Sequence, residues 1–313
     1  MRPSLALRLT LVPIAAALLC GCGSGEDRPD ELAGMIPPNP VGSLVVADLA
    51  ELRERAGLPE DADPSDGLAD GEPAEQRFAF NAAAAMPHLT DPRDLPIGEA
   101  LDESRVQAAA SSGFWGPESI TVVSSDQPFE EVATVLEAAG YARDGDVLES
   151  DRAALLVTYP VVAGGEDEVI AMGSSRDAVE AALERDGAPD GRPAELLEQL
   201  GEAPAVSLLA RIANPLGCLE AVAIADQVEG GEGELLLSIE GGADPALFLL
   251  DRAAGVRGLS PAASFEFAEP EAKGDLLRVS FRYPLEEPGA PLALLGEDVP
   301  GSTVYACRGA GGD

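Results

Sequence analysis

The sequence has 313 residues, of which 46% are hydrophobic and only 4% aromatic, and its formal charge is −36. A chain of this length and hydrophobic content can form one large domain or two modest ones, which excludes wholesale disorder. The negative charge repels nucleic-acid phosphates and anionic lipid headgroups, so nucleic acid is excluded as a partner.

The N-terminus has the features of a secretory signal. Two arginines precede an apolar run over residues 9–19, which is far shorter than the roughly 20 residues that cross a bilayer. The run ends at Leu19-Cys20-Gly21-Cys22, which resembles the lipobox of bacterial lipoproteins. This resemblance implies cleavage after residue 21, a diacylglycerol on Cys22 and usually a further amide-linked chain such as palmitate. Two or three acyl chains anchor a protein stably to a membrane. The alternative is an ordinary cleaved signal without a lipid.

The mature chain is expected to divide into a tether and a folded region. Residues 22–40 are predicted to be the lipidated Cys22 followed by a flexible, acidic tether that ends in a stiff Pro-rich spacer. Residues 41–313 are predicted to form the extracytoplasmic domain, with candidate halves at 41–203 and 204–313.

Hydrophobic periodicity and capping residues predict alternating groups of strands and helices. Strands are expected over residues 43–47, 119–124, 147–149, 154–162, 168–173, 206–212, 234–239, 262–268, 276–283 and 303–307. Helices are expected over residues 49–56, 74–86, 101–110, 129–139, 176–184, 193–200, 219–227 and 245–253. Residues 61–72 are acidic and rich in Gly and Pro, which predicts a mobile loop.

This order of elements predicts an α+β fold. Several consecutive antiparallel strands, with helices segregated between them, favour antiparallel sheets whose helices pack mainly on one face. A strand–helix–turn–strand–strand pattern occurs around 119–184 and again around 234–283, which suggests two similar halves. The segments Val46-Ala47-Asp48-Leu49, Gly140-Tyr141 and Met172-Gly173-Ser174-Ser175 resemble those of uncharacterised secreted or lipid-anchored actinobacterial proteins, a group from which no activity can be transferred.

Cysteine usage predicts one disulfide. The chain has four cysteines, of which Cys20 leaves with the signal and Cys22 is lipidated. Cys218 and Cys307 remain in an oxidising compartment, so we expect them to pair, and two free thiols are the alternative. A loop of this length would stabilise the fold by roughly 4 kcal/mol in the chain-entropy model.

Motifs for catalysis or metal binding are weak in this sequence. His88 is the only histidine and no Gly-x-Ser-x-Gly motif exists, so a Ser-His-Asp site is not predicted and His88 is expected to be a surface or packing residue. Four oxygen donors have the spacing of EF-hand positions, namely Asp61, Asp63, Ser65 and Glu72. However, Asp66 occupies the position that needs Gly. We therefore expect no metal and no cofactor, with these four residues as the only calcium candidates.

The sequence favours a non-catalytic protein that is lipid-anchored on the extracytoplasmic face of the cell membrane and has a binding or structural role at the envelope. An envelope protein or an apolar ligand would be its partner. One alternative is a carrier that holds an apolar or lipid ligand between sheet and helices, lined by Leu, Val and Phe248. The other is a hydrolase that uses two carboxylates within about 5–10 Å of each other.

Overall fold

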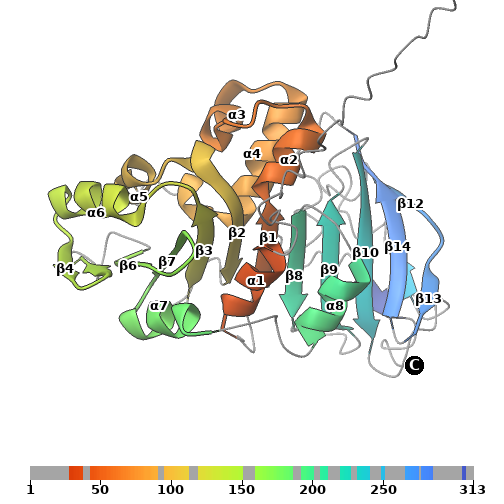
Figure 1. Cartoon of the computed structure of the whole chain (residues 1–313). Helices are drawn as coiled ribbons and strands as arrows, with labels where there is room; N and C mark the ends of the chain where they lie inside the picture. The colour runs from red at the N-terminus through yellow and green to blue at the C-terminus, as the bar shows by residue number, and fades with distance from the viewer. Residues whose placement is uncertain are drawn as a thin grey trace, which may run out of the picture.

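The fold centres on one long antiparallel sheet, seen in a computed structural model (Figure 1). The structure describes residues 28–37, 43–90, 95–112, 119–150, 159–185, 192–200, 205–210, 219–226, 231–239, 248–250, 265–274, 276–284 and 305–307. Its main strands are β1 (Ser43–Asp48), β2 (Val106–Ser112), β3 (Ile120–Ser125), β4 (Ala142–Asp144), β5 (Val147–Glu149), β6 (Val161–Gly164), β7 (Val169–Gly173), β8 (Ala205–Ala210), β9 (Leu219–Asp226), β10 (Glu232–Ile239), β12 (Glu266–Phe267), β13 (Glu271–Lys273) and β14 (Leu276–Arg282). They are hydrogen-bonded in the order β12-β14-β10-β9-β8-β1-β2-β3-β7-β6-β5-β4, and β13 also pairs with β14. A separate two-stranded ladder joins β11 (Phe248–Leu250) to β15 (Tyr305–Cys307).

Helices cover both faces of this sheet. The described helices are α1 (Arg28–Met35), α2 (Leu49–Ala56), α3 (Pro64–Asp70), α4 (Pro73–Ala85), α5 (Leu95–Ala100), α6 (Phe129–Ala138), α7 (Arg176–Leu183) and α8 (Arg192–Leu200). Buried side chains of α2, α4, α5 and α6 form one core cluster with the sheet, and those of α1, α7 and α8 form a second cluster on its other face. The predicted α+β class is confirmed. The helices are divided between the two faces more evenly than predicted. α2, α4, α5 and α6 lie on one face, and α1, α7 and α8 cover the other.

Strand β1 shows why both faces need a cover. Leu44 and Val46 belong to the cluster with α1, whereas Val45 and Ala47 belong to the cluster with α2. Successive side chains of a strand point to opposite faces, so a strand that is apolar throughout must be buried on both. β1 pairs with β2 on one side and with β8 on the other, and so joins the strands of residues 43–173 to those of residues 205–282.

The two parts of the sheet share a strand order. β1, β2 and β3 form a meander, and β7 then returns to pair with β3. β8, β9 and β10 form a second meander, and β14 returns to pair with β10. Each part is therefore a three-stranded meander followed by a returning strand. The helix of the second predicted pattern is absent at Phe248–Leu250, and the division into halves at residues 203 and 204 stays a prediction.

Two predicted helices are strands in the structure. Residues 101–110 were expected to be helical, but they contain the 3-10 turn η4 (Glu103–Arg105) and most of β2. Residues 219–227 were also expected to be helical, and they contain β9. Both segments are rich in Ala, whose high helix propensity is overridden here by ladders on both sides. The helix predicted at 245–253 is likewise wrong at Phe248–Leu250, which forms β11.

Two segments that were predicted to be irregular are helical. α3 lies within the loop predicted at 61–72, and it begins at Pro64, where proline is compatible with a first helical turn. α1 lies within the tether predicted at 22–40, and its Leu32 and Ala33 are only 1% exposed. The predicted tether is therefore shorter than expected at its C-terminal end.

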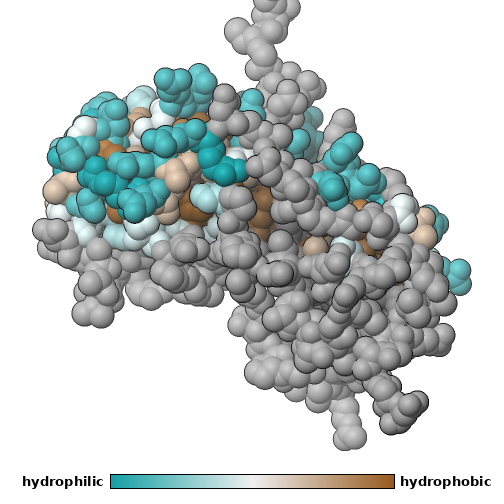
Figure 2. Space-filling view, turned by 90° about the horizontal axis from the view of Figure 1, so that it is seen from below, coloured by the Kyte–Doolittle hydropathy of each residue, from teal (hydrophilic) through white to brown (hydrophobic). Residues whose placement is uncertain are grey.

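Part of the described surface is polar. Figure 2 shows hydrophilic side chains over much of the described surface on the side of α6 and β4. Within the part of the chain that the structure describes, none of the helices is long and apolar enough to span a membrane.

Candidate functional site

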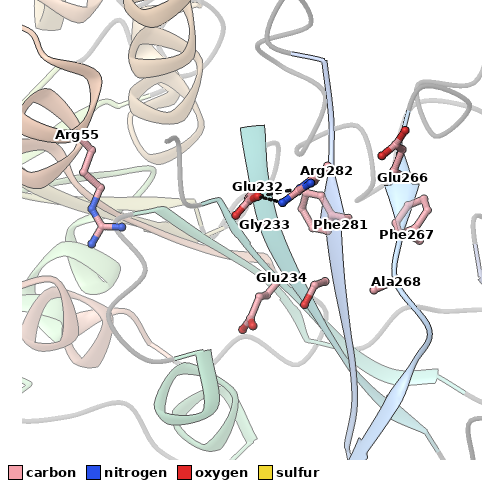
Figure 3. Close-up of a pocket in the computed structure, with 10 residues that line it drawn as sticks. Arg55, Glu232, Gly233, Glu234, Glu266, Phe267, Ala268, Phe281 and Arg282 are labelled. Atoms are coloured by element: carbon pink, nitrogen blue, oxygen red, sulfur yellow. Dashed lines mark hydrogen bonds and ion pairs between the residues drawn. The ribbon is translucent and has the colours of Figure 1, made fainter. Parts of the chain in front are cut away.

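A cleft lies at the β12 end of the sheet (Figure 3). Its volume is about 870 Å³, and β10, β12 and β14 form one wall while Arg55 of α2 lies on the opposite side. Two aromatic residues, Phe267 and Phe281, line it together with Gly233, Ala268 and Ser280. Its charged lining residues are Arg55, Glu232, Glu234, Glu266 and Arg282.

Aromatic side chains gather at this cleft in a chain that has few of them. Phe265 stacks on Phe267 with ring centroids 5.6 Å apart and meets Phe281 edge to face at 5.3 Å. Tyr283 extends the group, 6.2 Å from Phe281. Such pairs stabilise by about 0.5–1.5 kcal/mol beyond the burial of their area. Phe267 is the most accessible of the four, since the other three are buried.

Gly233 allows Phe281 to lie close to β10. A Cβ atom at residue 233 would come within 2.3 Å of the Phe281 ring and 2.6 Å of the carbonyl oxygen of Ala225. Any larger residue would therefore displace the ring that forms this wall of the cleft.

Ion pairs neutralise most of the charges around the cleft. Arg282 contacts Glu232 across the β10–β14 ladder at 2.5 Å, and Arg278 lies 3.5 Å from Glu234. Arg55 contacts Glu51 on its own helix at 2.7 Å. Glu266 is exposed and faces Arg282 in the β12–β14 register, yet no ion pair joins Glu266 to any residue that the structure describes.

A buried polar network lies directly behind this aromatic group. Asp226, at the end of β9, is 3% exposed and accepts hydrogen bonds from Asn81 Nδ2 at 3.0 Å and from the Tyr283 hydroxyl at 2.8 Å. Asn81 belongs to α4, so the network ties this helix to β9 and to the residue that follows β14. Burial, followed by the charge of Asp226 and its hydrogen bond, raises the pKa of Tyr283 well above its usual range.

Arg53 is a buried cation with a structural role. Its side chain is 1% exposed and donates to three backbone carbonyls, those of Ala62 at 3.0 Å, Val106 at 2.8 Å and Glu103 at 3.0 Å. The guanidinium also lies 5.2 Å from the centre of the Phe78 ring. Burial lowers the pKa of Arg53. These contacts join α2 to η4 and to the start of β2. Arg53 therefore stabilises the packing of α2 on the sheet, and it does not line the cleft.

His88 is a packing residue. It lies in the 3-10 turn η2 (Pro87–Leu89), and its side chain is fully buried with Nε2 3.5 Å from a carboxylate oxygen of Glu103. The ring packs against Tyr159 edge to face at 6.3 Å. His88 is thus placed in the core, where η2 contacts α4 and α5, and it does not line the cleft.

Three of the four calcium candidates, Asp63, Ser65 and Glu72, lie at helix starts, and Asp61 lies in the turn before α3. Asp63 caps α3 by accepting from Ser65 N at 2.7 Å, and Glu72 forms a capping box with Glu75 at the start of α4. A capping side chain accepts hydrogen bonds from amide N–H groups that the first helical turn leaves unpaired. This explains why Asp63 and Glu72 stand at these positions. Groups of three or more His, Cys, Asp or Glu residues suited to a metal are absent from the described residues.

Other predicted site residues lie outside the described residues. Cys22 and Cys218 are among them, and for Cys307 only its place in β15 is described. The same holds for Phe248 in β11. The disulfide between Cys218 and Cys307 and the lipidation of Cys22 therefore stay predictions.

The cleft was not predicted from the sequence, although the sequence carries a signal for it. Phe265-Glu266-Phe267 and Phe281-Arg282-Tyr283 both alternate aromatic and charged residues. Alternation with period two places the aromatic side chains on one face of neighbouring strands. Their pairing could not be read from the sequence, because it depends on the β12–β14 register.

Comparisons with known proteins give only distant structural similarity. No protein-family model matches the chain, and no curated protein sequence matches it. Crystal forms I and III of TP0453 each align with a TM-score of 0.45 and 10% identity, covering 84% and 83% of this chain and 96% and 97% of theirs. Crystal form IV of TP0453 aligns with a TM-score of 0.44 and 11% identity, covering 87% of this chain and 99% of its own.

Proposed function

We propose that this is a lipid-anchored, extracytoplasmic protein that acts by binding at the cell envelope rather than by catalysis. The observation that carries the binding role is the cleft of about 870 Å³ at the β12 end of the sheet, with its accessible Phe267. Binding sites for small molecules are concave, have apolar and aromatic walls and carry a few polar groups that orient the ligand.

The anchor rests on the lipobox that ends at Cys22. The helix α1 begins only six residues later, at Arg28. An extended chain spans at most about 3.5 Å per residue, so the sheet and its helices would be held within about 20 Å of the lipid surface. The strong negative charge of the domain would at the same time repel anionic headgroups over the Debye length of about 8–10 Å. Together, the short tether and the charge repulsion would hold the domain near the membrane while keeping it from adhering to the lipid headgroups.

Among binding roles, the cleft favours that of a carrier for an apolar ligand. The core between sheet and helices is closely packed, with Leu49 and Leu52 fully buried. A ligand would therefore bind at the cleft of the second half rather than between sheet and helices.

A carboxylate-based hydrolase is less well supported. In the cleft the carboxylates of Glu232 and Glu234 are already engaged in ion pairs with Arg282 and Arg278.

The binding role is tested with a neutral apolar fluorophore, N-phenyl-1-naphthylamine. We expect the full mature chain to enhance its fluorescence saturably, and we expect Phe267→Ala to weaken the binding by about fivefold or more, since aromatic contacts contribute about 1 kcal/mol. The matched control is Phe80→Ala, which removes an exposed phenylalanine on α4 that does not line the cleft. Equal binding by Phe267→Ala and the unmodified chain would exclude this cleft as the site.

A further inference from the structure

We propose that Asp226 is a positioning residue of the cleft, which acts through Tyr283 to hold the accessible ring of Phe267 in its binding position. This inference rests on the proposed binding role, and it concerns how the site is held in place. Two features of the structure carry it, the register of four neighbouring strands and a continuous series of side-chain contacts.

The strand register places Phe267 and Asp226 on one face of the sheet. Phe267 of β12 pairs with Phe281 of β14, which pairs in turn with Gly233 of β10 (Figure 3). Gly233 then pairs with Asp226 of β9. Residues that lie directly opposite each other in a ladder have their side chains on the same face. A single cross-strand row therefore leads from the accessible ring at the cleft to the buried carboxylate.

Side-chain contacts join the two ends of this row. The Tyr283 hydroxyl donates to Asp226 at 2.8 Å. The centre of the Tyr283 ring lies 5.8 Å from that of Phe265 and 6.2 Å from that of Phe281. Phe265 in turn stacks on Phe267 at 5.6 Å. The position of the Phe267 ring therefore depends on where the Tyr283 hydroxyl is held.

The buried end of this series is fixed to α4. Asn81 Nδ2 donates to Asp226 at 3.0 Å and to the carbonyl oxygen of Arg77, one turn earlier in the same helix, at 3.1 Å. Asn81, Asp226 and Tyr283 are at most 5% exposed. Hydrogen bonds to a buried charged group are stronger than those between neutral groups, so this network strongly favours one arrangement of its members. Loss of the Tyr283 hydroxyl should accordingly let the ring move.

The test is the binding of N-phenyl-1-naphthylamine to the full mature chain and to Tyr283→Phe, which keeps the ring and removes only the hydroxyl. We expect Tyr283→Phe to weaken binding by about threefold or more, as for the loss of one hydrogen bond. The emission of the bound fluorophore should also move to longer wavelength, because a displaced Phe267 ring admits water to the site.

Thr121→Val is the matched control. It removes another buried hydroxyl, which hydrogen-bonds the Tyr159 hydroxyl at 3.0 Å, and Thr121 does not line the cleft. We expect it to lower stability and to leave both the affinity and the emission unchanged. Equal weakening of binding by Thr121→Val would overturn the inference, because a general loss of stability would then account for the effect.

Combination with Phe267→Ala tests whether the hydroxyl acts through the Phe267 ring. In the Phe267→Ala background, Tyr283→Phe should have no further effect on affinity, since coupled residues have non-additive effects. Two effects that multiply in the double variant, or an unchanged affinity in Tyr283→Phe alone, would overturn the positioning role and leave the apolar site in place. Failure of the unmodified chain to bind the fluorophore would overturn the proposed function as well.

Discussion

Asp226 lies where α4 meets β9 and the end of β14. Burying a carboxylate is costly unless its oxygens accept hydrogen bonds, and here Asn81 and Tyr283 supply them at 3.0 and 2.8 Å. Tyr283 also contacts Phe281 of the cleft wall. The position of this wall therefore depends on a network that joins α4 to β9 and to the end of β14.

Tyr283→Phe removes one donor from Asp226 and should lower the free energy of unfolding by about 1–3 kcal/mol, measured by urea denaturation at neutral pH. The pKa of Tyr283 is raised in the folded state, so the folded state keeps its proton at a pH where the unfolded tyrosine loses it. Its contribution is complete below about pH 10, the usual tyrosine pKa, and is lost as the pH rises above that value. Stability should thus fall less steeply between about pH 9 and about pH 11 in Tyr283→Phe. Identical slopes in the two proteins would contradict this account of the network.

At the level of elements, the sequence predicted well those segments whose local signals agree with their packing. The helix predicted at 49–56 is confirmed as α2, where Asp48 caps the start and Gly57, with a φ of 69°, ends it. The predicted strands around residues 120, 170, 236 and 280 are confirmed as β3, β7, β10 and β14. In each of these, residue type, periodicity and tertiary environment favour the same structure.

Prediction failed where packing overrides propensity. The Ala-rich β2 and β9 are central strands, each paired with a neighbouring strand on both sides. β9 alternates Ala221, Ala223 and Ala225 with larger residues, a period of two that its helix propensity obscured. The cleft was missed because it requires the pairing of β12 with β14, which local patterns do not specify.

The fit between β10 and β14 is tested by Gly233→Ala. The added methyl group would lie 2.3 Å from the Phe281 ring, and overpacking of this kind costs typically about 1–3 kcal/mol. Thermal unfolding should therefore occur at a lower temperature. Gly98→Ala is the matched control, because residue 98 is exposed in α5 and an added Cβ would meet only a Glu103 oxygen at 3.7 Å, so it should leave stability unchanged or raise it. If the two substitutions have equal effects, Phe281 does not require Gly233.

On the scale of the whole molecule, the charge of −36 is the dominant property. Like charges on a compact domain repel one another, and salt screens this repulsion. The melting temperature should therefore rise between about 20 mM and about 500 mM NaCl. Tetramethylammonium chloride at equal ionic strength should act alike, because screening depends on charge and not on ion identity. A melting temperature that falls with either salt would show that attractive surface ion pairs outweigh the repulsion.

The central claim, that the protein is a lipid-anchored binding protein, depends most directly on Cys22. The decisive measurement is the intact mass of the protein from the membrane fraction, compared with Cys22→Ala and with Cys218→Ala as a control that retains the lipobox. We expect a mature chain that begins at Cys22 and carries the added mass of its acyl groups, present in Cys218→Ala and lost in Cys22→Ala. An unmodified mass in the soluble fraction would contradict the anchor, and it would leave Cys22 free to compete for the disulfide predicted between Cys218 and Cys307.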